Sequence, residues 1–339
     1  MCAFLGGWST IRALLLPEEG EGAMENLLWQ LIPWGYEILL QIETWRAPLL
    51  DTFFSAVTEL GGERFYIILF AVVYWCISKP IGVGAALAAL FSATFNAWVK
   101  ALADIPRPVS PALEDTLKDA AITRRLTALF EETSPSWPSN HAQGSTVMWG
   151  YLAVRAKSAW FWVVTVVLIG LIAFSRMYGG VHFPQDVIGG VLIGVVFLAL
   201  WFAFEPRFRS LLVRLPDGAI IGLALAVPVL VLLILRLEDA VTPMGATIGM
   251  GVGYVWQART ASFSPAGIWW KRVLRGILGL VLVFAVYLGL SALFGLFDES
   301  VGEFLGTVLR TLRYALVGLT GFYAAPWLFL RLRLAEREA

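Results

Sequence analysis

Long apolar runs separated by short polar links make up most of the chain after residue 63. The runs predict helices at about residues 64–78, 81–99, 142–156, 159–176, 186–204, 217–236, 241–256, 273–295 and 312–330. Many of them approach the length of about 20 residues that a helix needs to cross the hydrocarbon core of a bilayer. The pattern therefore predicts an all-α fold, a polytopic transmembrane helical bundle with nine crossings.

Residues 26–60 follow a different pattern. Apolar positions recur there near helical spacing and alternate with charged positions, which are Glu37, Glu43, Arg46 and Asp51. A helix with one apolar and one charged face favours the membrane interface. We expect two amphipathic helices in this stretch, and the alternative of a spanning helix within residues 27–44 stays open.

These patterns divide the chain into three parts. They are an amino-terminal segment with the interfacial helices (1–62), a transmembrane core (63–206) and a four-helix transmembrane extension of unknown role (207–339). The core contains a long polar connection, residues 101–137, and a loop of that length usually caps a functional site. No secretory signal pattern precedes residue 24, and either Met1 or Met24 can be the initiator.

The composition places the chain in a membrane. Hydrophobic residues make up 58% of it and charged residues 15%, and the mean hydropathy is +0.74, values outside the range of soluble domains. The 25 basic and 25 acidic residues balance, which argues against a nucleic-acid partner because phosphate contacts need a basic excess. Cys2 and Cys76 lie far apart and indicate no disulfide framework.

Three polar clusters occur at the ends of predicted crossings. The clusters are Lys100 with Arg107, then Ser139 with Asn140 and His141, and finally Arg176 with His182 and Asp186. The first follows the second crossing, the next opens the third, and the last connects the fourth and fifth. All three therefore emerge on one face of the membrane, where they can share a substrate.

The basic residues of these clusters, together with Ser139 and Asn140, suit phosphate binding. A phosphoryl group in transfer carries negative charge on its equatorial oxygens, so a catalyst without metal needs several fixed cations and N–H donors. Lys100, Arg107 and Arg176 supply cations, and arginine can contact phosphate through two N–H groups. Ser139 and Asn140 lie where a helix is predicted to begin, and its unpaired amides favour an anion.

The chain has only two histidines, and both fall in these clusters. His182 and Asp186 are four residues apart, so the carboxylate can accept the Nδ1 proton and leave Nε2 free to attack phosphorus. His141 would then protonate the leaving alkoxide and later activate water. This route needs no cofactor, and no cluster has a metal-ligand pattern.

The spacing of the three clusters resembles the signature of a known family. Six residues separate Lys100 from Arg107-Pro108, the second cluster reads Pro138-Ser139-Asn140-His141, and five residues separate Ser175-Arg176 from His182, with three more before Asp186. This pattern is similar to that of the type 2 phosphatidic acid phosphatase (PAP2) superfamily over roughly residues 45–205. The resemblance implies a membrane phosphatase for lipid phosphates or pyrophosphates, with the roles given above. Asn140 stands where the family usually has glycine. The resemblance therefore indicates the type of reaction more directly than the preferred substrate.

The distribution of positive charge predicts the orientation. Thirteen basic residues fall on the side opposite the clusters: Lys79, Arg155, Lys157, Arg207, Arg209, Arg214, Arg259, Lys271, Arg272, Arg275, Arg331, Arg333 and Arg337. Cytoplasmic loops carry such an excess. We therefore expect a multi-pass protein of the plasma (inner) membrane, surrounded by membrane lipids, with its site on the non-cytoplasmic face.

Two other interpretations stay open. A phosphotransferase would use the same chemistry but pass the phosphoryl group to an acceptor other than water. A transporter or scaffold would use the carboxy-terminal helices and carry a vestigial site. Single residues also have structural interpretations: Lys100 and Arg107 as interfacial anchors, and Asp186 as a helix cap. The sequence does not indicate the oligomeric state.

Overall fold

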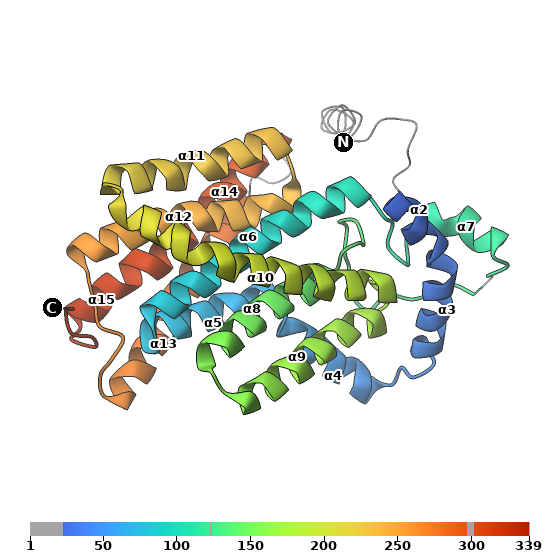
Figure 1. Ribbon diagram of the computed structural model, residues 1–339, viewed down its shortest axis with the longest axis horizontal. Coiled ribbons are helices and arrows are strands. Elements are labelled where there is room, and N and C mark those ends of the chain that lie inside the picture. Colours follow the sequence, from blue (N-terminus) through green and yellow to red (C-terminus); the bar gives the residue numbers. More distant parts are fainter. Residues whose placement is uncertain (1–22, 123, 297–301, 339) are drawn as a thin grey trace. The chain divides into compact units, whose positions relative to one another are not determined.

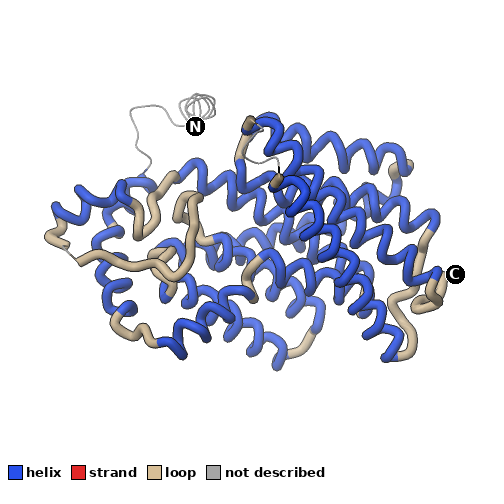
Figure 2. The backbone as a smooth tube through the Cα atoms, turned by 180° about the vertical axis from the view of Figure 1, so that it is seen from behind, coloured by secondary structure: helices blue, strands red, loops and turns tan. Residues whose placement is uncertain are grey.

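The computed structural model describes residues 23–122, 124–296 and 302–338. Within these ranges the secondary structure is helical apart from one isolated bridge between Phe263 and Arg337, and Figure 2 shows helices joined by loops. The all-α prediction is confirmed. Of the two candidate initiator residues, Met1 lies outside the described residues.

The chain forms two compact units, which are described separately. One comprises Met1–Tyr66 and Phe95–Leu200, and the other Ile67–Thr94 and Trp201–Ala339. This grouping reflects which residues lie close together in space. The division of the chain into three parts at residues 62 and 206, made from the sequence, stays a prediction.

The first unit contains the motif residues. Its elements are α2 (Ala23–Gln30), α3 (Ile32–Glu43), α4 (Pro48–Glu59), η1 (Pro111–Leu113), α7 (Glu114–Asp119), α8 (Asn140–Ala156) and α9 (Ala159–Tyr178), with parts of α5 (Glu63–Cys76), α6 (Lys79–Ala103) and α10 (Pro184–Arg214). α8 and α9 lie side by side, and α9 also contacts α3 and α4 (Figure 1). The left-handed backbone of Lys157, with φ of 51°, ends α8 just before α9 begins.

The amino-terminal segment forms three helices where the sequence predicts two. α2 and α3 are separated at Leu31, and Pro33 stands in the first turn of α3, where its missing N–H breaks no helical hydrogen bond. Neither α2, with 8 residues, nor α3, with 12, has the length of about 20 that a crossing needs. The described residues therefore do not support a spanning helix within 27–44.

The apolar face of α3 packs against protein. Ile32, Tyr36 and Leu39 recur at helical spacing and are buried, together with Leu113 and Leu117 from the connection after α6. This stripe buries itself in the core of the first unit because the long polar connection folds over it. The expected interfacial helix thus serves as a support for the capping loop.

The second unit consists of close-packed helices. They are α11 (Asp217–Leu235), α12 (Glu238–Thr260), α13 (Trp269–Gly295), α14 (Glu303–Leu319), the π-helical turn η2 (Thr320–Ala324) and α15 (Ala325–Arg331), with parts of α5, α6 and α10. A Cβ atom added to Gly249 of α12 would lie 1.8 Å from the carbonyl oxygen of Ala315 in α14. Glycine is required there because the two backbones touch.

All nine predicted helices are present, with two altered boundaries. The last begins at Glu303 where the apolar run predicts residue 312, because the first turns of α14 carry polar residues on one face. The fifth continues through Pro206 to Arg214. Among the residues that the structure describes, five helices are long and apolar enough to cross a membrane, namely α6, α9, α10, α11 and α13. The count of nine crossings stays a prediction.

Arg275 is one of the thirteen basic residues that the sequence assigns to the side opposite the clusters. It is fully buried in the second unit. Its guanidinium group donates to the carbonyl oxygens of Ser264 at 3.0 Å and of Pro265. The side chain satisfies backbone acceptors of the loop before α13, where an unpaired carbonyl would be unfavourable.

Candidate active site

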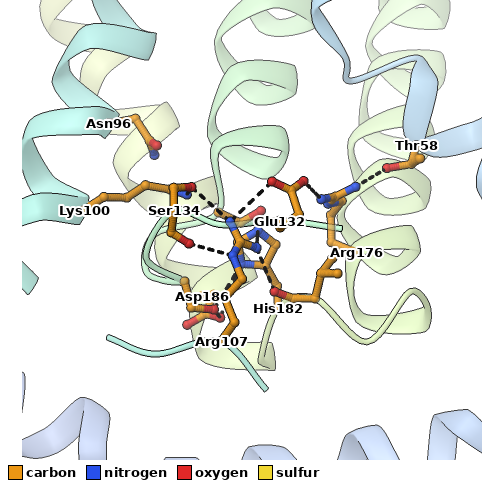
Figure 3. A network of polar contacts seen from close by, with 12 residues as sticks. Thr58, Asn96, Lys100, Arg107, Glu132, Ser134, Arg176, His182 and Asp186 are labelled. Carbon is orange, nitrogen blue, oxygen red and sulfur yellow. Dashed lines mark hydrogen bonds and ion pairs between the residues drawn. The ribbon is translucent and has the colours of Figure 1, made fainter. Parts of the chain in front are cut away.

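The first and third motifs meet at His182. Nη1 of Arg107 lies 3.2 Å from Nε2 of His182 and donates to the carbonyl oxygen of Val181 at 2.9 Å (Figure 3). The second motif joins them through its backbone, because the Ser139 N–H donates to the carbonyl oxygen of Asp186 at 3.0 Å. The structure thus brings the three separated clusters into one site at the ends of α6 and α9 and the starts of α8 and α10.

Lys100 and Arg107 share a partner in the capping loop. Lys100 is in the last turn of α6, and its Nζ donates to Oγ of Ser134 at 2.9 Å. Arg107 donates from Nε to the Ser134 carbonyl oxygen at 2.7 Å and from Nη2 to Oγ at 3.2 Å. Both cations are buried, so Ser134 holds two of the positive charges in fixed positions.

Arg176 is held from two sides at the end of α9. Its Nη1 donates to Oγ1 of Thr58 at 2.7 Å, and its Nη2 pairs with Oε1 of Glu132. The guanidinium carbon lies 5.2 Å from the ring centre of Phe130, a cation–π contact. These partners come from α4 and the capping loop, so Arg176 is oriented by parts of the chain far from its own motif.

His182, in the bend before α10, and Asp186, in the first turn of α10, form the expected pair. Nδ1 of His182 lies 3.4 Å from Oδ2 of Asp186, and the same oxygen accepts from the Phe183 N–H at 2.7 Å and from the Ser136 hydroxyl. The carboxylate faces Nδ1 and the Arg107 donor faces Nε2. These partners assign the ring proton to Nδ1 and leave the Nε2 lone pair toward Arg107.

The charge state of His182 follows from its surroundings. Burial, followed by the positive charges of Arg107, Arg176 and Lys100, lowers the pKa of His182 well below its usual value. Both effects disfavour a charged imidazolium. His182 is therefore neutral at neutral pH, which is the form that carries a lone pair.

The second motif lies at the start of α8. Ser139 is the N-cap of α8, and its buried side chain accepts from the Ala142 N–H at 3.5 Å. Asn140 is exposed at the start of the helix, and His141 is partly exposed in the first turn. A Cβ atom added to Gly61 would lie 3.2 Å from Cδ2 of His141. The end of α4 therefore packs directly against this histidine.

No group of three or more His, Cys, Asp or Glu side chains in the described parts of the chain could hold a metal ion. The side chains that converge are mainly cationic. They are Lys100, Arg107 and Arg176, with the two neighbouring imidazoles. Such a set attracts an anion of the size of phosphate.

Comparison with known families agrees with the motif spacing. Residues 81–210 match the model of the PAP2 superfamily, and residues 241–337 match that of the PAP2 superfamily phosphatase transmembrane extension. The chain belongs to the PAP2 superfamily. It is accordingly a multi-pass membrane protein, and most of its carboxy-terminal extension matches a segment known in PAP2 proteins.

Relatives of this PAP2 chain match it over part of their length. Lipid phosphate phosphatase delta from Arabidopsis thaliana is 25% identical over 187 residues, which cover 51% of this chain and 42% of that protein. Sphingosine-1-phosphate phosphatase 1 from Rattus norvegicus is 26% identical over 151 residues, 43% of this chain and 33% of that protein. The chain thus spans less than half the length of these relatives.

One solved structure is similar to part of this chain. The crystal structure of a transmembrane PAP2 type phosphatidylglycerolphosphate phosphatase from Bacillus subtilis is 20% identical to this chain. It covers 54% of this chain and 95% of its own, with a TM-score of 0.42.

Four residues of the site lie outside the PAP2 motifs, and the sequence analysis does not identify them. They are Thr58, Glu132, Ser134 and Ser136. Ser136 has the best local signal, because it stands three residues before Ser139 in the second motif. The other three have no spacing rule, and only the fold shows that they reach the motif residues.

The capping loop is fixed on both sides of the site. The Leu129 N–H donates to the Gly179 carbonyl oxygen at 2.9 Å, and the Ser136 N–H donates to that of Ile105 at 2.7 Å. Further along, the Thr127 N–H donates to Oε1 of Glu43 in α3 at 2.9 Å. The loop segment between Leu129 and Ser136 therefore carries Glu132 and Ser134 over the cationic cluster.

Proposed function

We propose that this PAP2 protein is a membrane-embedded, metal-independent phosphatase, a phosphoric monoester or pyrophosphate hydrolase that acts on a lipid substrate. The observation that carries the proposal is the 3.2 Å approach of the Arg107 guanidinium to Nε2 of His182. A neutral imidazole nitrogen next to a fixed cation is placed where a phosphoryl group can be both bound and attacked.

The first step uses His182 as nucleophile. The Nε2 lone pair forms a bond to phosphorus, and the bond between phosphorus and the lipid oxygen breaks. His141, which becomes protonated once the anionic phosphate group of the substrate lies beside it, gives a proton to the departing oxygen. Asp186 accepts from Nδ1–H and stabilises the positive charge that develops on the ring. Lys100, Arg107 and Arg176 neutralise the charge on the phosphoryl oxygens.

The second step releases phosphate. His141, now neutral, takes a proton from water as the water oxygen attacks phosphorus, and the bond between phosphorus and Nε2 breaks. His141 is again protonated, and His182 returns to its neutral form. Ser139 and Asn140 contribute through the start of α8, whose first amides and dipole favour an anion beside His141.

The substrate class follows from the setting of the site. The motif residues stand at the ends of long apolar helices, which suits an amphiphile whose phosphate reaches the interface. The names of the relatives include lipid phosphates and sphingosine 1-phosphate, which supports a lipid phosphate or pyrophosphate substrate. The distribution of basic residues supports a site on the non-cytoplasmic face of the inner membrane.

A phosphate-release assay on the purified protein in detergent tests the function. The panel contains phosphatidic acid, phosphatidylglycerol phosphate, a polyprenyl pyrophosphate and a sphingoid base phosphate, each with and without chelator. We expect release that is insensitive to chelator and lost in His182→Ala. Release only when an alcohol acceptor is added would instead identify a phosphotransferase. Full activity of His182→Ala would refute the histidine mechanism.

A further inference from the structure

A carboxylate bridges the two arginines of the site. Oε1 of Glu132 pairs with Nη2 of Arg176, and Oε2 lies 3.6 Å from Nη2 of Arg107 (Figure 3). One oxygen thus faces each guanidinium group. Two oxygens of a phosphate would make the same contacts, because arginine binds carboxylate and phosphate with one geometry.

The exposure of these side chains shows which of them meets the solvent. The side chain of Glu132 is 28% exposed, whereas those of Arg107 and Arg176 are 6% and 2% exposed. The carboxylate therefore lies on the open side of the buried cations. A phosphate that is to contact both arginines must occupy the place that Glu132 holds, and two anions cannot share it.

The buried charges explain why an anion stands there. Lys100, Arg107 and Arg176 converge around His182, and unpaired cations in such a site repel one another and lack solvent. Glu132 places one negative charge between Arg107 and Arg176. In the substrate-free protein it thereby lowers the repulsion between the two guanidinium groups and holds them in position.

The loop allows this carboxylate to move alone. Its backbone is hydrogen-bonded on either side of Glu132, at Leu129 and at Ser136. Glutamate has three side-chain torsions, so rotation can turn the carboxylate toward solvent while these anchors stay in place.

We propose that Glu132 is an internal competitor of phosphate in this site. It pairs with Arg107 and Arg176 in the free enzyme, is displaced when the phosphate group of the substrate enters, and returns as inorganic phosphate leaves. Glu132 thereby weakens the binding of substrate and product alike, and it keeps the product from occupying the site. The proposal rests on the proposed function in one respect, the assignment of both arginines to phosphate.

Binding of inorganic phosphate to the purified protein at pH 8 tests the proposal without turnover. Isothermal titration compares the wild type with Glu132→Gln. The matched control is Glu131→Gln, which removes the same charge from an exposed neighbour in the same loop. We expect the Kd for phosphate to fall about tenfold or more in Glu132→Gln, the effect of removing a competitor worth about 1.4 kcal/mol. The control should bind like the wild type.

A purely structural role gives the opposite sign. If Glu132 only orients the arginines, Glu132→Gln leaves them misplaced and the Kd rises. An unchanged or raised Kd overturns the proposal. If Glu132→Gln fails to fold, the Kd for phosphate is measured with Glu132→Asp. The shorter side chain of aspartate bridges the arginines less well, so this variant should also have a lower Kd.

Steady-state kinetics separate this inference from the proposed function. With an active substrate, KM and the Ki for phosphate should both fall in Glu132→Gln, and kcat should not rise because product leaves more slowly. Tighter phosphate binding in a protein that hydrolyses no lipid phosphate would support the internal competitor and refute the phosphatase. If the wild type hydrolyses a lipid phosphate, but the wild type and Glu132→Gln bind phosphate with equal affinity, the phosphatase is supported and the internal competitor is refuted.

Discussion

Thr58 of α4 accepts a hydrogen bond of 2.7 Å from Nη1 of Arg176 at the end of α9. The two residues are 118 positions apart in the sequence. An amino-terminal helix, which the sequence assigns to the membrane interface, therefore orients a cation of the candidate site. Residues 23–62 belong to the first unit, which contains the motif residues.

Thr58→Val should weaken substrate binding. The variant keeps the shape of the side chain but leaves Nη1 of a buried guanidinium without this acceptor, a loss of about 1.5–3 kcal/mol for a bond to a charged group. We expect KM to rise by at least about tenfold, with Thr58→Ser close to the wild type. Equal KM values for Thr58→Val and the wild type would show that Arg176 needs no partner in α4.

Ser136→Ala should lower the rate of the chemical step. Its hydroxyl donates to the same Asp186 oxygen that faces His182, so its removal loosens the carboxylate that orients the imidazole. We expect kcat to fall about tenfold while KM changes little. Ser110→Ala, which removes the N-cap of η1 in the same loop, is the control. Loss of activity through KM alone would contradict this role.

The acid limb of the pH profile should lie at low pH. Burial and the neighbouring cations lower the pKa of His182, so its neutral, nucleophilic form persists as the pH falls below the ordinary histidine value of about 6.5. Activity is lost only when the pH passes below the lowered pKa. A plot of the logarithm of kcat/KM against pH measures this limb. An acid limb caused by His182 with an apparent pKa above about 6.5 would contradict the buried, cation-flanked position of this histidine.

Gly61→Ala should destabilise the site around His141. The added Cβ atom would lie 2.6 Å from Cγ2 of the buried Ile172 and 3.2 Å from Cδ2 of His141. A β-branched side chain in a packed core cannot move away cheaply, and such overpacking costs about 1–3 kcal/mol. We expect a lower Tm and lower kcat. Gly144→Ala, where the nearest atom is 3.7 Å away, should lower neither, because alanine fits there and favours the helix.

Part of this site could be predicted from the sequence because its chemistry is encoded in short spacings. Lys100 and Arg107, and His182 and Asp186, stand close in the chain at helix ends, so the local geometry of a helix or turn nearly determines where they point. The four partners outside the motifs could not be predicted in this way. Thr58 and Glu132 reach Arg176 from separate segments, and no spacing rule relates their positions.

The sequence alone determined the helices and predicted that the three motifs emerge on one face, because long apolar runs must be helical in lipid and an even number of crossings returns the chain to the same face. Only the tertiary structure decided that α3 turns its apolar stripe to the protein and that Glu132 fills the space between two arginines. Those outcomes depend on which surfaces meet after folding. Burial of apolar area and pairing of charges act between distant segments, and local sequence carries no record of the partner.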